Sequence, residues 1–141
     1  MSETTNAAKG HTPNDNQPRS DLWYERDIDL GFAHLNIRGE YIGNDLLIVV
    51  RGGEPHIGTV VVAYPRPSLT GDGTMSVTSS VLNTIGHKDE QICRYLAEAA
   101  ATRCQTTAVC LGGFHIDDID VTQINAVMDA VHTLVAEIKE V

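Results

Sequence analysis

Strand-like segments fill the first half of this chain, and helical periodicity appears only in the second half. Apolar and polar residues alternate over residues 23–40, and Gly31 supplies a turn between two half-buried antiparallel strands. Two continuous apolar runs follow at 45–51 and 57–64, and each predicts a strand buried on both faces. Pro65 and the residues after it are expected to end the second run. This early concentration of strands requires a sheet that later helices cover.

The second half predicts two helices separated by a strand at 106–111. The first helix spans about 87–103, and its apolar stripe consists of Ile92, Tyr95, Leu96, Ala99 and Ala100. The last helix begins with a capping box, in which Asp120 is the cap and Gln123 follows three residues later. The Ser/Thr-rich segment 75–82 fits either a strand or a structured loop. The order ββββ(β)αβα predicts an α/β fold, with two C-terminal-half helices packed on a mixed, largely antiparallel sheet.

The length of 141 residues is that of one domain. Residues 1–21 are polar and rich in Asn, Thr and Pro, so we expect a disordered tail there. Residues 22–141 are then a single domain. A net charge of −9 disfavours nucleic acids and anionic membranes as partners. The chain has no apolar run of about 20 residues and no apolar signal core, so a cytoplasmic protein is expected.

The three cysteines form an odd set without a C-x-x-C motif. Reduced thiols in a cytosolic protein are the simplest interpretation. Cys110 lies in an apolar strand, which indicates an inert core residue.

An anion site is one interpretation of the start of the first helix. His87 and Lys88 place positive charge at a helix N-terminus, which the helix dipole disfavours unless an anion binds there. The neighbouring acids Asp89 and Glu90 offer a second explanation, because they neutralise that charge locally. Further donors for an anion are Arg66, Ser68, Ser79 and Ser80.

A metal site is a separate possibility, since His56, His87 and His115 each lie in a glycine-containing loop and Asp117 follows the last of them. The alternative is that each histidine hydrogen-bonds the backbone of its own loop. The sequence has no phosphate-binding P-loop, no dinucleotide fingerprint, no H-E-x-x-H and no G-x-S-x-G. No nucleophile paired with a base stands out, so spacing alone names no reaction.

Five motifs together carry a family resemblance. They are Gly53-Glu-Pro-His-Ile-Gly58, Arg66-Pro-Ser68, Ser79-Ser-Val-Leu-Asn83, Gly86-His-Lys-Asp-Glu90 and Gly112-Gly-Phe-His-Ile-Asp117. In this order and spacing the chain, from about Trp23 onward, resembles the prenylated-flavin chaperone-like family, whose best-known type is the small third subunit of bacterial gallate decarboxylase. The resemblance implies a fold similar to the proteasome-assembly chaperones, which are small α/β proteins that dimerise.

The resemblance further implies a non-catalytic carrier of prenylated flavin mononucleotide (prenylated FMN) that serves a prenylated-flavin-dependent decarboxylase, with a homodimer as the expected state. A metal-dependent hydrolase or decarboxylase subunit and a pure protein-assembly chaperone are the alternatives. The flavin ring would contact Phe114, Ile57 and Tyr64. The expected cofactor-binding residues are His56, Arg66, Ser68, Ser79, Ser80, His87, Lys88 and His115.

Overall fold

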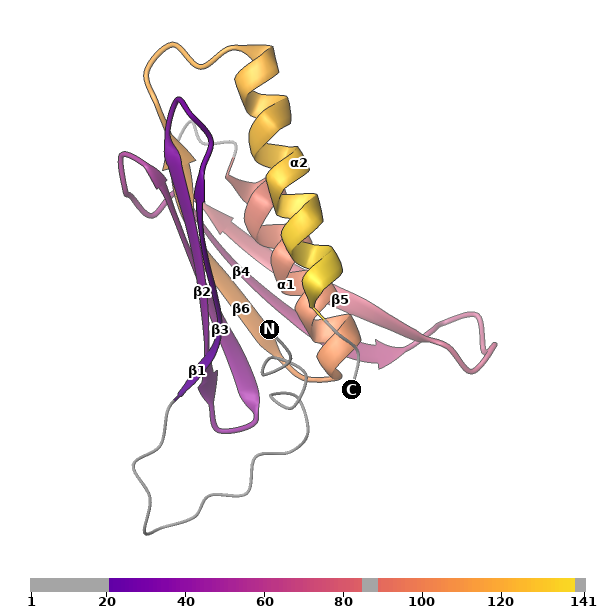
Figure 1. The fold of residues 1–141 in the computed structure, drawn as a ribbon. Helices are drawn as coiled ribbons and strands as arrows, with labels where there is room; N and C mark the ends of the chain where they lie inside the picture. Colours follow the sequence, from indigo (N-terminus) through magenta and orange to yellow (C-terminus); the bar gives the residue numbers. More distant parts are fainter. Residues whose placement is uncertain (1–20, 85–88, 139–141) are drawn as a thin grey trace, which may run out of the picture.

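Residues 21–84 and 89–138, which the computed structural model describes, form a six-stranded sheet and two helices (Figure 1). The elements in chain order are β1 (Leu22–Asp29), β2 (His34–Ile42), β3 (Asp45–Gly53), β4 (Thr59–Pro67), β5 (Met75–Asn83), α1 (Glu90–Cys104), β6 (Ala108–His115) and α2 (Val121–Glu137). The expected tail lies outside the described residues except for Asp21. His87 and Lys88 also lie outside them.

The spatial order of the strands is β1-β2-β3-β6-β4-β5. Only β3 and β6 are parallel to each other, and the other neighbouring strands are antiparallel. The predicted mixed, largely antiparallel sheet with two C-terminal-half helices is therefore confirmed. Because β6 enters between β3 and β4, the carboxyl ends of β3 and β6 lie side by side at one end of the sheet.

Both helices pack on the same face of the sheet (Figure 1). Alternate side chains of the central strands point to the helices and form the core, as the buried positions Leu46, Ile48 and Val50 of β3 illustrate. The intervening residues Leu47 and Val49 are only half-buried. Within one copy these strands are thus buried on one face only, because no described element packs on the opposite face, and cover on both faces stays a prediction.

Local details of three elements differ from the sequence prediction. The segment that is ambiguous between strand and loop in the sequence is strand β5, which pairs along its whole length with β4. Strand β4 continues through Pro65 to Pro67, although proline is expected to end it. Beyond Ala63, β4 no longer pairs with β6, so these prolines lie where the strand has only one neighbour. Tyr95 belongs to the predicted apolar stripe but is 38% exposed, whereas Cys93 and Ala97 of the same helix are buried.

The three cysteines are free and buried, as expected. Burial raises the pKa of the Cys104 thiol to about 11. Burial, followed by contact with Cys93, also raises the pKa of Cys110 well above its usual value. The capping box of α2 is confirmed, since the Asp120 carboxylate accepts the Gln123 backbone N–H at 2.8 Å. In the described ranges, neither helix has the length and apolar character needed to cross a bilayer.

Candidate functional site

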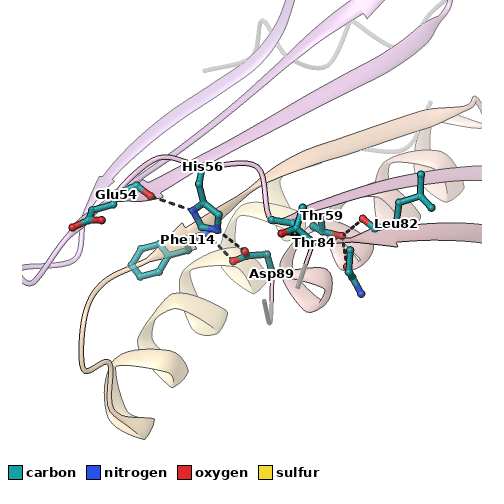
Figure 2. Close-up of polar contacts among 9 residues, drawn as sticks. Glu54, His56, Thr59, Leu82, Thr84, Asp89 and Phe114 are labelled. Carbon is teal, nitrogen blue, oxygen red and sulfur yellow. Dashed lines mark hydrogen bonds and ion pairs between the residues drawn. The ribbon is translucent and has the colours of Figure 1, made fainter. Parts of the chain in front are cut away.

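Three separate segments meet at the carboxyl ends of β3 and β6. They are the β3–β4 connection with Glu54 and His56, the residue Asp89 just before α1, and the end of β6 with Phe114 and His115. We call these five residues the histidine edge, and Figure 2 shows the contacts around Asp89. Connections at the carboxyl ends of parallel strands are where α/β sheets commonly bind ligands.

Asp89 holds the three segments together. It is only 4% exposed, and its two carboxylate oxygens have different partners. Oδ1 accepts the backbone N–H of Phe114 at 2.8 Å, and Oδ2 lies 2.9 Å from Nε2 of His56 (Figure 2). A buried carboxylate needs such compensation, because leaving it without partners costs several kcal/mol. Asp89 is therefore an anchor for the whole edge.

His56 uses both of its ring nitrogens. Nδ1 lies 3.2 Å from the backbone carbonyl oxygen of Glu54, and Nε2 faces the Asp89 carboxylate. Both of these partners are acceptors, so any proton on either ring nitrogen has a hydrogen-bond partner within the chain. With both nitrogens directed at protein groups, His56 has no nitrogen free to exchange a proton with a substrate in this conformation.

Two glycines make room for the Asp89–His56 pair. A Cβ atom on Gly58 would lie 2.0 Å from Oδ2 of Asp89, and a Cβ atom on Gly113 would lie 2.5 Å from the same oxygen. Any larger residue at either position would displace the carboxylate. The glycines at 58 and 113 are thus required by packing, rather than by turn conformation.

A second polar network fixes the adjacent end of β5. Thr59 is fully buried, and its hydroxyl donates to Oδ1 of Asn83 at 2.7 Å. The amide of Asn83 donates to Glu90 in the first turn of α1 at 2.8 Å. The backbone N–H of Thr84 donates to the Gly58 carbonyl oxygen at 2.8 Å, beside the Asp89 anchor. Thr84 and Glu90 are therefore tied to the sheet at the same end as Asp89.

The exposed part of the histidine edge combines a polar and an apolar surface. Nε2 of His115 lies 3.1 Å from Oδ1 of Asp117, and its ring meets the His56 ring edge-on at 6.0 Å. Phe114 packs edge-on against Phe32, with ring centroids 6.5 Å apart. Ile57, which follows His56 in the chain, is 59% exposed.

The predicted metal site receives no support from the part of the chain that the structure describes. No group of three or more His, Cys, Asp or Glu side chains is arranged there to hold a metal ion. His56 and His115 do lie together, with Asp117 bonded to His115. The third predicted histidine, His87, falls outside the described residues.

Arg66 and Ser68 lie at the opposite end of β4. Thr59, beside the anchor, and Arg66 are seven residues apart on this strand, or about 23 Å. Nε of Arg66 donates to Thr78 at 2.6 Å, and the Ser68 hydroxyl lies 2.9 Å from the Thr70 hydroxyl. We call residues 65–76 the hairpin end. Tyr64 directly precedes this segment on β4, so this tyrosine is remote from Phe114 and Ile57.

The two adjacent serines of β5 point to opposite faces of the sheet. The Ser79 hydroxyl donates to Glu98 of α1 at 2.6 Å, on the helix-covered face. Ser80 is exposed and pairs with Val62, on the uncovered face. Within one copy of the chain, the described donors proposed from the sequence therefore do not converge on one anion.

Comparison with known families settles the relationship of the chain. The model of the prenylated flavin chaperone LpdD-like domain matches residues 31–141. The chain belongs to this family. One chain in the solved structure "Crystal Structure of a Novel Chaperone Complex for Yeast 20S Proteasome Assembly" is also similar, with 13% sequence identity and a TM-score of 0.46. That alignment covers 82% of this chain and 95% of the other. No curated protein matches the sequence.

For this LpdD-like domain, sequence reasoning locates the edge but misses its anchor. His56 and His115 are proposed from their loops, whereas Asp89 is interpreted only as a charge that balances a helix dipole. In the structure its side chain makes no cap hydrogen bond to α1 and turns to His56 and Phe114 instead. The sequence feature that could have indicated this role is the pair of glycines at 58 and 113. Their lack of side chains leaves the space that the Asp89 carboxylate occupies.

Proposed function

We propose that this chain is a non-catalytic carrier that binds prenylated FMN at the histidine edge and supplies it to a prenylated-flavin-dependent (de)carboxylase. Membership of the LpdD-like prenylated flavin chaperone family supports the cofactor. The observation that carries the location is the buried Asp89, which fixes His56 and the end of β6 at the carboxyl ends of the parallel strands. The edge is thereby organised before any ligand arrives.

The chemistry of the edge suits an FMN-type ligand. Such a ligand carries a phosphate dianion and a large apolar ring. The exposed His115 supplies a donor within reach of solvent, and His56 packs beside it. His87 and Lys88 directly precede Asp89 in the sequence and add positive charge to the proposal. Ile57 and Phe114 are the residues proposed to contact the ring.

Arg66, Ser68 and Ser79 are not proposed to share this site within one copy. Arg66 and Ser68 lie at the hairpin end, and Ser79 is bonded to Glu98 under the helices. Ser80 is on the uncovered face of the sheet. Of the eight cofactor-binding residues expected from the sequence, we therefore retain four for the proposed site. These are His56, His87, Lys88 and His115.

A carrier requires binding groups and no proton-transfer pair. Both nitrogens of His56 are directed at protein acceptors, which argues against general acid–base catalysis by this histidine. The other parts of the proposal are a cytoplasmic location, a partner decarboxylase and a homodimer. A pure assembly chaperone remains the second candidate, and ligand binding separates the two.

Anaerobic titration with reduced prenylated FMN tests the proposal. We expect saturable binding of one cofactor per chain, with reduced FMN as the comparison that isolates the contribution of the prenyl-derived ring. His115→Ala should weaken binding about tenfold, which is the loss expected for one charge-assisted contact. Ser68→Ala at the hairpin end is the matched control and should bind like the wild type. Absence of binding to the folded wild type would favour the assembly chaperone.

A further inference from the structure

The two edge strands of the sheet, β1 and β5, differ in how they are protected against further pairing (Figure 1). β1 carries four charged residues, and its register with β2 shifts near its start. Charges and irregular register are common ways to protect an exposed edge. β5 has no charged residue, proline or glycine, and it pairs with β4 in one unbroken register over Met75–Asn83. No described strand other than β4 pairs with it, so β5 is an open and unprotected edge.

The hydrogen bonds between β4 and β5 determine which backbone groups face this open edge. The N–H of Thr84 donates to the Gly58 carbonyl oxygen, and the N–H of Ser68 donates to the Thr74 carbonyl oxygen. These two pairs lie at opposite ends of the same register, and bonded pairs alternate with unbonded pairs in an antiparallel ladder. The even-numbered residues of β5 therefore bond to β4. The odd-numbered residues direct their N–H and C=O groups to the open edge, and they are Met75, Val77, Ser79, Val81 and Asn83.

The side chains of these odd-numbered residues lie on the face that α1 covers. The Ser79 hydroxyl donates to Oε2 of Glu98 at 2.6 Å, and the Asn83 amide donates to Oε1 of Glu90 at 2.8 Å. Arg94 balances Glu90 in an ion pair at 2.7 Å. Within the described ranges no ion pair balances Glu98, whose contact with Ser79 is a neutral one. The middle of the open edge therefore has one uncompensated carboxylate beside it.

We propose that an extended segment of another protein pairs with β5 as a further strand of the sheet, with a lysine or arginine of that segment beside Glu98. Its main chain bonds the outward N–H and C=O groups of the odd-numbered residues, as in other cases of strand addition to a sheet edge. Its side chains on the α1 face lie next to Val77 and Val81, which are half-buried, so aliphatic residues suit those positions. This inference concerns a protein partner and does not depend on the flavin site.

Charge disfavours a second copy of this chain as the occupant of the edge. A two-fold axis through the middle of β5 would place Ser79 of one copy opposite Ser79 of the other and bring the two Glu98 carboxylates together. Like charges directly opposite one another on paired strands are destabilising, whereas opposite charges stabilise the pair. The net charge of −9 favours a basic partner in the same way. Charge complementarity therefore selects a different protein with a basic, extended segment.

A short peptide added to the full chain tests the proposal. The probe is acetyl-Thr-Val-Thr-Lys-Thr-Val-Thr-amide, whose two valines and lysine share one face when the peptide is extended. We expect saturable changes in the amide chemical shifts of residues 75–83 and slower hydrogen exchange at the odd-numbered ones. The same peptide with Glu in place of Lys should bind about fivefold more weakly, and Glu98→Gln should remove that difference. No shift changes in β5 at millimolar peptide, or equal binding of both peptides to the wild type, would overturn the proposal.

Proline variants of the two edges separate strand addition from other modes of binding. Val77→Pro removes an outward N–H and leaves the bonds to β4 in place, so it should weaken peptide binding about tenfold or more. Asp27→Pro is the matched control on β1, because the Leu30–Ala33 hydrogen bond and the β1–β2 register direct the Asp27 N–H away from β2.

The control should bind the peptide like the wild type, and circular dichroism checks that both variants are folded. Undiminished binding to folded Val77→Pro would overturn pairing at the edge. Self-association of the wild type that Val77→Pro abolishes would assign the edge to a second copy and overturn the proposed partner. If Val77→Pro does not fold, the amide shifts of the wild type still decide the question, and the flavin titration judges the carrier role separately.

Discussion

The histidine edge and the hairpin end lie at opposite ends of β4, and they organise similar residue types in different ways. At the histidine edge, Asp89 and His56 come from segments 33 residues apart and meet around a buried carboxylate. At the hairpin end, Arg66 and Ser68 form contacts within one hairpin and are half-buried. Both regions have loops rich in polar residues and glycine. Only the first is built from parts that the fold itself must bring together.

This contrast indicates which of the two regions can hold a defined ligand geometry. A side chain fixed by several distant segments loses little freedom when a ligand binds. A side chain held only by neighbours within one hairpin has fewer distant contacts to fix it before binding. The position of a polar residue in the topology therefore matters more for the proposed carrier role than its residue type.

The largest expected difference between the regions is in stability. Asp89→Ala leaves the N–H of Phe114 without this acceptor and removes the ion-pair partner of His56, so it should lower the free energy of unfolding by about 3 kcal/mol. Ser68→Ala at the hairpin end should change it by less than about 0.5 kcal/mol. Chemical denaturation of both variants measures the difference. Equal free energies of unfolding for Asp89→Ala and Ser68→Ala would contradict the role of Asp89 as anchor.

The glycines should show the next largest difference. Gly58→Ala and Gly113→Ala place a methyl group against the Asp89 carboxylate and should each cost about 1–3 kcal/mol. Gly71, in the β4–β5 connection, has φ +70 and open space where a Cβ atom would lie, so Gly71→Ala carries only the conformational penalty of about 1 kcal/mol. Thermal unfolding of the three variants ranks them. A Gly71→Ala variant less stable than Gly58→Ala would contradict the packing explanation.

Alkaline pH should destabilise the core, to which Cys104 at the end of α1 belongs. The usual thiol pKa is 9.0, and burial raises that of Cys104 to about 11. In the unfolded chain this thiol ionises near pH 9, whereas in the folded chain it stays protonated, so its contribution to stability is complete below pH 9 and declines above it. Urea titrations between pH 8 and 11 should show less decline in Cys104→Ala than in the wild type. If the free energy of unfolding declines equally in the wild type and in Cys104→Ala, groups other than Cys104 cause the decline.

The smallest expected effect belongs to Asp72 in the hairpin connection. Hydrogen bonds from the side chain and backbone of Thr74 lower the pKa of this exposed carboxyl. A lowered folded-state pKa stabilises the protein above the usual Asp pKa of 3.8 and ceases to do so in stronger acid. Asp72→Asn should therefore differ slightly from the wild type at neutral pH and converge with it as the pH falls. A difference that grows in acid would contradict this assignment.

Much of the architecture follows from local sequence patterns. The alternation around Gly31 predicts the β1–β2 pair, and Asp120 with Gln123 predicts the start of α2. Such features depend on residues close together in the chain. The insertion of β6 between β3 and β4 is a non-local property, and periodicity does not reveal it. That insertion is what places His115 beside His56 and separates both from Arg66.

The same limit explains which parts of the site can be predicted. The loop histidines are identifiable because glycine and histidine are unusual together, and the structure places His56 and His115 in contact. The grouping of Ser79 with Ser80 fails as a single donor set, since neighbouring strand residues face opposite sides of a sheet. The role of Asp89 depends on the approach of Gly58 and Gly113, which only the fold determines.

Mapping of the bound cofactor on the backbone tests the central claim most directly. Amide chemical shifts of the wild type are followed during anaerobic addition of reduced prenylated FMN. The largest changes should fall on residues 53–58 and 113–117, with residues 65–76 unchanged. Changes concentrated at the hairpin end, or the absence of any change under saturating cofactor, would contradict the histidine edge as the cofactor site.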